Sequence, residues 1–221
     1  MNVYGSVYDL VRAAMSAVVF IVAFLAMKKL KLFTERKKML IVATLVIWLV
    51  FSLSVEFIPF ENLFITFKSP EAAYHYYCGA KSSVELIVEG EDCDLIVGEK
   101  KGSLTELLIP KISDGWKIGL YTNKKLKYHG SFDGVLIRVY QFKNSNDYYI
   151  LVHASPRGEV TIADSYGTEF YPVGGARLQP EKSFFYYGHI ANFDTQYTLT
   201  VNGDTIVCDE ENNLIRKVFF W

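Results

Sequence analysis

Two long apolar runs without a single charged residue lie within the first sixty positions, and a short basic segment separates them. The first run is AAMSAVVFIVAFLAM (Ala13–Met27), and the second is MLIVATLVIWLVFSLSV (Met39–Val55). A helix needs about 20 residues to cross the hydrocarbon core of a bilayer. Lipid offers no partner to backbone polar groups, so a single segment that crosses it must be helical. The sequence therefore predicts a hairpin of two transmembrane helices, about 10–30 and 39–58, in a region that covers residues 1–56.

A signal peptide is the alternative interpretation of the first run, because the run also has the length of a signal-peptide core. In a signal peptide, however, basic residues precede the apolar stretch and a site of small residues ends it. Here the basic cluster follows the run, and no such site closes it. The helical hairpin is therefore the preferred interpretation.

The basic segment between the runs orients the predicted hairpin, because cytoplasmic loops beside membrane spans are rich in Lys and Arg. The N-terminal tail has only Arg12, and Glu56 and Glu61 follow the second run. We expect a plasma-membrane protein with loop 28–38 in the cytoplasm and with the N-terminus and C-terminal domain outside. A specific site for anionic lipid in the loop is the alternative to general attraction by the leaflet. The basic residues of the loop are Lys28, Lys29, Lys31, Arg36, Lys37 and Lys38.

The two runs contain no Asp, Glu, Lys or His, which are the residues that mark proton or ion paths inside membranes. We therefore expect the hairpin to serve as an anchor. A face of small residues in the first run suits close helix packing, against the second helix or against a partner protein. The residues of this face are Ala13, Ala14, Ser16 and Ala17.

Residues 57–221 are predicted to form an extracytoplasmic β-rich domain. Sixteen basic residues stand against twenty-one acidic ones there, which argues against nucleic acid as a partner. Ser69, Pro70 and Glu71 have the pattern of a helix start, and Gly79 can end the helix at Cys78. About ten short runs of β-branched and aromatic residues follow, and they predict a sandwich or open barrel. Asn202-Gly203 predicts the tight turn of one hairpin.

Three cysteines, Cys78, Cys93 and Cys208, fall in this domain. Disulfides persist outside the cytoplasm, and Cys78 with Cys93 would close the smallest loop. That pair is the best candidate for a possible disulfide, in which case Cys208 would be a small apolar residue in the sheet. Pairs that involve Cys208 and three reduced thiols are the alternatives. No Cys and His residues have the spacing of a zinc site, and no metal site or cofactor is predicted.

The candidates for catalysis and cation binding are weak. His153 and His189 lie in apolar strands, where we expect partly buried, hydrogen-bonded side chains. Ser155, His153 and Asp164 would form a triad on paper, but no nucleophile motif surrounds the serine. The acidic segment EGEDCD (Glu89–Asp94) lacks the glycine and closing glutamate of an EF-hand, so a solvated turn is preferred over a calcium loop. The terminal VFFW is expected to form a last core strand. No catalytic residue is assigned.

Three segments resemble those of small membrane-anchored proteins of Gram-positive bacteria that carry an extracytoplasmic β domain of uncharacterised activity. They are FKSPEAAYHYY (Phe67–Tyr77), DGWKIG (Asp114–Gly119) and TIADSYGTEF (Thr161–Phe170). The resemblance implies a location in the cell envelope and a β-rich fold, and it transfers no functional residue.

The expected function is that of a membrane-anchored extracytoplasmic binding or accessory module for an unidentified ligand. Two alternatives remain open. One is a cell-envelope enzyme, which would need a pocket with converging polar groups. The other is a sensor or regulatory subunit that acts through a partner membrane protein, because a loop of eleven residues offers little output of its own. The expected partners are the lipid bilayer and another envelope protein.

Overall fold

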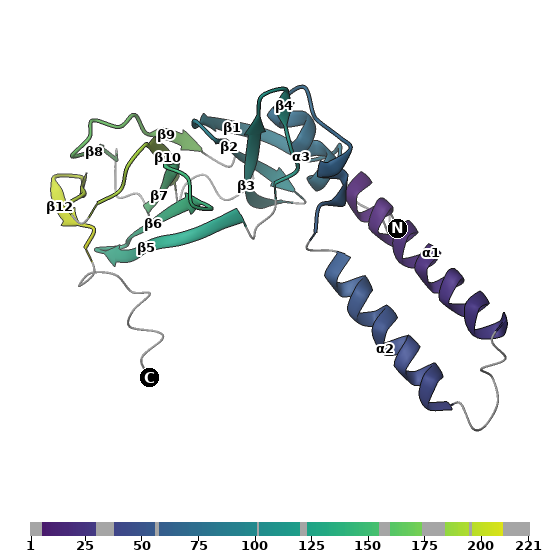
Figure 1. Ribbon diagram of the computed structural model, residues 1–221. Helices are drawn as coiled ribbons and strands as arrows, with labels where there is room; N and C mark the ends of the chain where they lie inside the picture. Colours follow the sequence, from purple (N-terminus) through teal and green to yellow (C-terminus); the bar gives the residue numbers. More distant parts are fainter. Residues whose placement is uncertain are drawn as a thin grey trace.

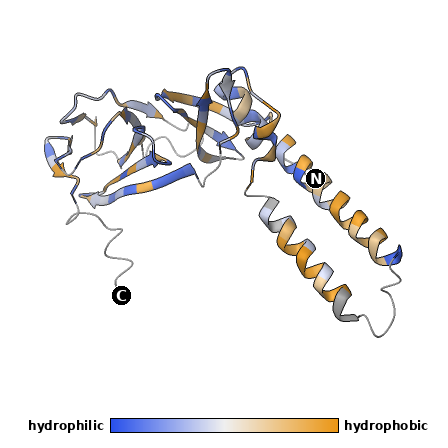
Figure 2. Cartoon of the chain, in the orientation of Figure 1, coloured by the Kyte–Doolittle hydropathy of each residue, from blue (hydrophilic) through white to orange (hydrophobic). Residues whose placement is uncertain are grey.

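A hairpin of two apolar helices extends from one end of a β-rich domain in the computed structural model of the chain (Figure 1). The structure describes residues 6–29, 38–55, 58–100, 102–119, 123–154, 160–173, 184–194 and 196–209. Helix α1 spans Val7–Lys29 and helix α2 spans Lys38–Val55. Apolar residues colour both helices over most of their length (Figure 2). The coarse prediction of an N-terminal apolar helix followed by a mainly-β domain is confirmed.

Helix α1 is the one helix among the described residues that is long enough and apolar enough to cross a membrane. The apolar part of α2, Ile41–Ser52, is shorter than a span requires. Lys28 and Lys29 end α1 and Lys38 begins α2, at the end of the hairpin that points away from the β domain (Figure 1). Three other basic positions of the predicted loop lie outside the described residues: Lys31, Arg36 and Lys37.

The two helices contact each other through small and aromatic side chains. The Trp48 indole N–H donates to the Ser16 carbonyl at 3.1 Å, and the hydroxyls of Ser16 and Ser52 are 2.7 Å apart. The Phe20 and Trp48 rings meet edge to face at 5.2 Å. Ser16, from the predicted small-residue face, therefore packs on the second helix of the same chain.

A short 3-10 helix, η2 (Phe60–Leu63), and helix α3 (Pro70–Cys78) connect the hairpin to the first sheet. The Ser69 hydroxyl accepts the Ala72 N–H at 3.2 Å, and Gly79 ends α3 with a φ of 103°. This capped helix is the one that the sequence predicts. It buries Ala73, Tyr74 and Cys78 against one face of the first sheet, as expected for a helix that covers a sheet.

Twelve strands form three antiparallel sheets in the described chain. The first has the order β1-β2-β3-β4, the second β5-β6-β7-β10-β9 and the third β12-β11-β8. The strands are β1 Ser83–Glu89, β2 Cys93–Lys100, β3 Ser103–Ile112, β4 Gly115–Trp116, β5 Lys124–Phe132, β6 Val135–Phe142, β7 Tyr148–Ala154, β8 Ile162–Asp164, β9 Tyr171–Val173, β10 Phe184–Ile190, β11 Thr198–Val201 and β12 Asp204–Val207.

The second sheet is central, and each of its faces packs on another sheet. Along β7, Tyr149 and Leu151 join Leu95 and Leu108 of the first sheet in one apolar cluster. The alternate residue Ile150 points to the opposite face and packs with residues of the third sheet. Alternation along a strand produces both faces. The interfaces are those of a sandwich, with a third sheet added to the predicted two.

The predicted Asn-Gly turn joins β11 to β12, and Asn202 and Gly203 both have positive φ, 53° and 92°. This is the geometry that a type I′ hairpin requires, and the prediction is confirmed. The terminal VFFW lies outside the described residues, so its predicted strand remains a prediction.

Candidate functional site

A buried ion pair joins the hairpin to the β domain. Arg12, in the second turn of α1, lies 2.6 Å from a carboxylate oxygen of Glu61 in η2, and the two side chains are 6% and 8% exposed. The guanidinium also donates to the Ile58 carbonyl at 2.8 Å and lies 4.2 Å from the centre of the Tyr8 ring. Tyr76 of α3 donates its hydroxyl to Glu61 at 3.3 Å. The ion pair therefore connects α1 to the segment after α2, and its carboxylate also binds α3.

Apolar contacts reinforce this joint. Tyr8 and Ile118 are both buried, and Tyr76 and Tyr77 of α3 pack against them. The Tyr8 and Tyr77 rings are 4.9 Å apart. An aromatic cluster of this kind resists bending because its rings are large and rigid. The hairpin is thus fixed to the first sheet by packing as well as by charge.

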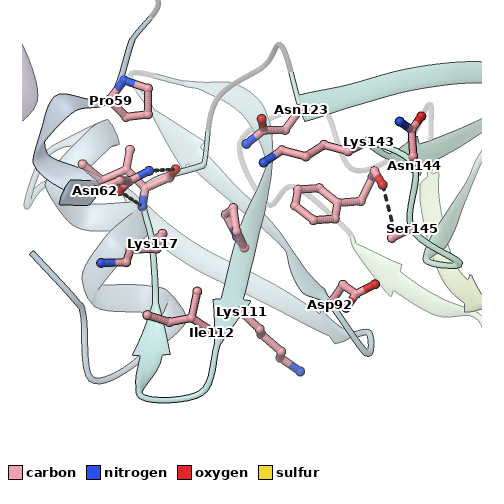
Figure 3. Close-up of a pocket in the computed structure, with 13 residues that line it drawn as sticks. Pro59, Asn62, Asp92, Lys111, Ile112, Lys117, Asn123, Lys143, Asn144 and Ser145 are labelled. Atoms are coloured by element: carbon pink, nitrogen blue, oxygen red, sulfur yellow. Dashed lines mark hydrogen bonds between the residues drawn. The ribbon is translucent and has the colours of Figure 1, made fainter.

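A cleft of about 690 Å³ lies beside the joint, between the first sheet and the turn that connects β6 to β7 (Figure 3). Pro59 and Asn62 of the segment after α2 form one wall, and Lys143, Asn144 and Ser145 of the β6–β7 turn form the facing wall (Figure 3). The remaining lining residues are Asp92, Pro110, Lys111, Ile112, Lys117, Ile118, Asn123 and Phe142.

Paired backbone contacts hold the wall nearest the hairpin. The Asn62 side chain donates to the Ile118 carbonyl at 3.1 Å and accepts the Ile118 N–H at 2.8 Å. Phe67 and Trp116 exchange backbone hydrogen bonds of 2.9 and 3.0 Å. These contacts hold η2 and the segment that follows it, up to Phe67, against the end of the first sheet, so this wall is preorganised.

The facing wall is a tight turn. Lys143 has a φ of 47°, and its N–H donates to the Asn123 carbonyl at 2.9 Å. The Ser145 hydroxyl donates to the Phe142 carbonyl at 2.8 Å. These bonds hold the backbone of the turn and leave the exposed Lys143 and Asn144 side chains at the rim of the cleft (Figure 3).

The lysines that line the cleft differ in the groups that their ammonium nitrogens contact. Lys111 contacts the Asp94 carboxylate at 2.8 Å, so its charge is neutralised locally. Lys117 donates to the Ile65 carbonyl and to the Thr66 hydroxyl at 2.8 and 2.9 Å, which are neutral acceptors. No carboxylate of the described residues pairs with Lys143, whose ammonium lies 5.2 Å from the Phe142 ring centre. Lys143 therefore presents its positive charge to the cleft beside amide and hydroxyl groups, which together suit an anion, whereas the Lys117 ammonium points away from Lys143 (Figure 3).

A second polar cluster lies behind the cleft, around the buried carboxylate of Asp147. The Asp147 carboxylate accepts hydrogen bonds from the backbone N–H groups of Glu91, Asp92 and Cys93 at 2.8, 2.6 and 3.0 Å, and His189 Nε2 lies 2.8 Å from it. Burial alone would raise the pKa of Asp147, but the bonds from His189 and the loop amides outweigh it and lower the pKa to about 2. Asp147 ties the β1–β2 loop to the second sheet.

An Asp–His pair also occurs in nucleophilic enzymes, so the neighbouring thiol is relevant. Cys93 Sγ lies 3.3 Å from the Tyr149 hydroxyl, and that hydroxyl donates to the Cys93 carbonyl at 2.6 Å. Burial raises the pKa of the Cys93 thiol well above its ordinary value. Because the thiolate is the reactive form, burial disfavours reaction at this cysteine, and the hydrogen bonds of Asp147 give the cluster a structural role.

The possible disulfide between Cys78 and Cys93 is absent from the described residues. All three cysteines are buried free thiols. Cys78 packs with Ile96 on the face of the first sheet that α3 covers, whereas Cys93 packs with Val97 on the opposite face. The sheet itself separates the two sulfur atoms. Cys208 is buried between the second and third sheets, as expected of a small apolar residue.

The structure corrects several smaller expectations. His189 is hydrogen-bonded as predicted, but His153 stacks on Phe185 at 4.4 Å, and its Nε2 is buried without a hydrogen-bond partner. Asp94 of the predicted solvated turn is buried and accepts the Trp116 indole N–H at 2.7 Å.

The imagined triad is not assembled among the described residues. Asp164 accepts the Tyr197 hydroxyl at 2.9 Å in the third sheet, whereas His153 stacks on Phe185, which packs toward the first sheet. Ser155 lies outside the described residues.

The Arg12–Glu61 pair was not predicted from the sequence, although the sequence contains a signal for it. Each residue stands just beyond an apolar run, on the same predicted side of the membrane, so an antiparallel hairpin brings the opposite charges to one level. No comparable signal marks the cleft, because Lys117 and Lys143 come from unrelated parts of the chain.

The described residues contain no group of three or more His, Cys, Asp or Glu side chains arranged to hold a metal ion. No protein-family model, curated protein or solved structure matches the chain.

Proposed function

We propose that the protein is a membrane-anchored extracytoplasmic module that binds an anionic ligand in the cleft beside its joint. In this proposal both α1 and α2 cross the membrane, loop 28–38 faces the cytoplasm, and the β domain lies outside. Large apolar side chains exposed along both helices support the anchor: Val18, Ile21, Val22, Phe24 and Leu25 of α1, and Val42, Val46, Ile47, Leu49 and Val50 of α2. A membrane accounts for such continuous apolar exposure better than water does.

The observation that carries the binding proposal is the composition of the cleft. Lys143, which pairs with no carboxylate of the described residues, lines the cleft together with neutral hydrogen-bonding side chains such as Asn123 and Asn144. Phosphate and carboxylate groups accept hydrogen bonds from these donors, and charge-assisted bonds are about twice as strong as neutral ones. A cleft preformed on one wall by the Asn62–Ile118 clamp loses little entropy when it binds.

The topology is tested by thiol labelling in intact cells. The native cysteines are buried, so a membrane-impermeant maleimide should report introduced residues. We expect labelling of Asp204→Cys in intact cells and of Thr34→Cys only after lysis. Labelling of Thr34→Cys alone would reverse the orientation, and labelling of both in intact cells would contradict the two-span hairpin.

Ligand binding is tested with the full-length protein in nanodiscs of phosphatidylcholine, which has no net charge. An environment-sensitive fluorophore on Asn144→Cys should respond to glycerol phosphate in a saturable manner. Lys143→Gln should weaken this response about tenfold, because one charge-assisted bond is lost. The matched control is Lys125→Gln on the exposed edge strand β5, which should leave the response unchanged. A response that is absent, or equal in both variants, would contradict anion binding in the cleft.

A regulatory subunit is the second candidate, and the rigid joint favours it. Because Arg12 and Tyr8 lock α1 to η2 and α3, a movement of the β domain would tilt the hairpin as one body. Crosslinking in native membranes tests this role. Capture of one membrane protein by the chain and its loss in Arg12→Met, with the β domain still folded, would support regulation.

A further inference from the structure

The joint fixes the height of a short apolar turn relative to the bilayer. Arg12 precedes the uncharged run of α1, and it binds both the Ile58 carbonyl and Glu61. From Arg12 to Lys28, α1 rises about 24 Å, which together with the long side chains at its two ends approaches the thickness of the hydrocarbon core, about 30 Å. Arg12 therefore lies at one edge of the core, and the turn that it holds lies in the interfacial layer.

This turn exposes large apolar side chains to an unusual degree. Leu63 is 74% exposed and Phe64 is 86% exposed, more than any other large apolar residue of the described chain. Ile58 of the same segment is 46% exposed. Exposure of these apolar groups to water is unfavourable, whereas at the height of the interface they can enter the lipid.

The same segment forms a wall of the cleft. Pro59 and Asn62 line it, and they flank and interleave with the exposed apolar residues. The opposite wall, the β6–β7 turn, follows the end of β6. The start of β5 lies beside it, since Lys124 pairs with Phe142 in the ladder. Strand β5 begins at the end of its sheet that is turned toward the hairpin (Figure 1). The cleft therefore lies next to the interface, within reach of lipid headgroups.

The charges of the cleft select among headgroups. Lys143 pairs with no carboxylate of the described residues, and Asp92 is the one acidic residue among the described ones that line the cleft. An ammonium group without a paired carboxylate favours a phosphate that carries a net negative charge over the neutral, zwitterionic headgroup of phosphatidylcholine.

We propose that Ile58, Leu63 and Phe64 insert into the bilayer interface and that the cleft binds the phosphate headgroup of an anionic lipid through the Lys143 ammonium and the neighbouring side-chain amides. The inference rests on the proposed function, whose membrane anchor and anion-binding cleft it combines. It names the ligand class as a glycerophospholipid with net negative charge, taken from the leaflet that surrounds the hairpin.

Insertion is tested by quenching. A fluorophore on Leu63→Cys should be quenched by lipids that carry a nitroxide near the headgroup, in nanodiscs of the full-length protein. The control is Phe132→Cys, another exposed apolar position, at the far end of β5, which should not be quenched. Equal quenching at the two positions, or none at position 63, would overturn the insertion.

Headgroup binding is tested by native mass spectrometry of the detergent-purified chain titrated with phosphatidylglycerol or phosphatidylcholine. We expect selective retention of phosphatidylglycerol, about tenfold weaker in Lys143→Gln and unchanged in the matched control Lys125→Gln. Lys143→Arg keeps the charge and should retain the lipid. Retention of both lipids alike, or no effect of Lys143→Gln, would overturn the proposal.

Soluble glycerol phosphate distinguishes this inference from the proposed function. If glycerol phosphate binds to the cleft but phosphatidylglycerol is not retained, the module still binds an anion, and the lipid source is wrong. If neither binds, the anion-binding function fails as well.

Discussion

Two buried carboxylates, Glu61 and Asp147, join distant parts of this chain in different ways. Glu61 pairs with one charged side chain, Arg12, which lies 49 residues away. Asp147 is held by three backbone N–H groups of the β1–β2 loop and by His189. Glu61 depends mainly on one cation, whereas the hydrogen bonds of Asp147 are spread over three backbone groups and one side chain. The joint of the hairpin is therefore the more easily broken by a single substitution.

The largest effect is expected from Arg12→Ala. Removal of one partner of a buried ion pair costs about 3–5 kcal/mol, because the other charge remains buried without compensation. Hydrogen exchange of the full-length protein in nanodiscs should show lost protection in η2 and α3, with the third sheet unchanged. The double variant Arg12→Met/Glu61→Leu should recover most of the protection, and a double variant as damaged as the single one would contradict this explanation.

Asp147→Asn should have the next largest effect, about 2–3 kcal/mol of unfolding free energy, because hydrogen bonds to a charged acceptor become bonds to a neutral one. Thermal unfolding of the chain in detergent measures it. Asp133→Asn, an exposed aspartate in the β5–β6 turn, is the matched control and should leave the midpoint in place. Equal shifts of the unfolding midpoint in both variants would show that Asp147 stabilises the fold no more than an exposed aspartate does.

Acid should reduce the contribution of Asp147 to the free energy of unfolding. The pKa of Asp147 is about 2 in the folded chain, below the ordinary value of 3.8. Its contribution is therefore fully present above about pH 4 and is lost as the pH falls toward 2, and it amounts to about 2 kcal/mol. Chemical unfolding at a series of pH values should show this loss, and Asp147→Asn should lack that component.

The smallest effect is expected from His189→Ala, which removes one of the partners of Asp147 and leaves the three amides. We expect about 1 kcal/mol of destabilisation and an upward shift of the Asp147 pKa toward its ordinary value. Carboxyl titration by NMR of the isotope-labelled full-length chain follows that shift. An Asp147 pKa that does not move would assign the depression to the loop amides alone.

Local features of the fold were predictable because their causes lie within a few residues. Ser69, Pro70 and Gly79 define α3 through caps, and Asn202-Gly203 defines a hairpin through positive φ. The apolar runs predict helices because length and the absence of charge are properties of a segment. The third sheet was not predicted, since alternation along a strand indicates a buried face without naming the sheet that covers it.

The candidate site depended on contacts between distant segments. Cys78 and Cys93 are near in sequence, yet the sheet places them on opposite faces. Lys117 and Lys143 are far apart in sequence, yet both line the cleft. Separation along the chain was misleading in both cases, because strand pairing and sheet packing decide which side chains meet.

The sequence by itself determined an apolar helix at the N-terminus, a β-rich remainder, one capped helix and one tight turn, because propensity, periodicity and capping act locally. Only the tertiary structure decided that Arg12 meets Glu61, that Asp147 holds a distant loop, and that a cationic cleft lies beside an exposed apolar turn. These features arise from packing, in which the charge and shape of one segment are completed by another far away in the chain.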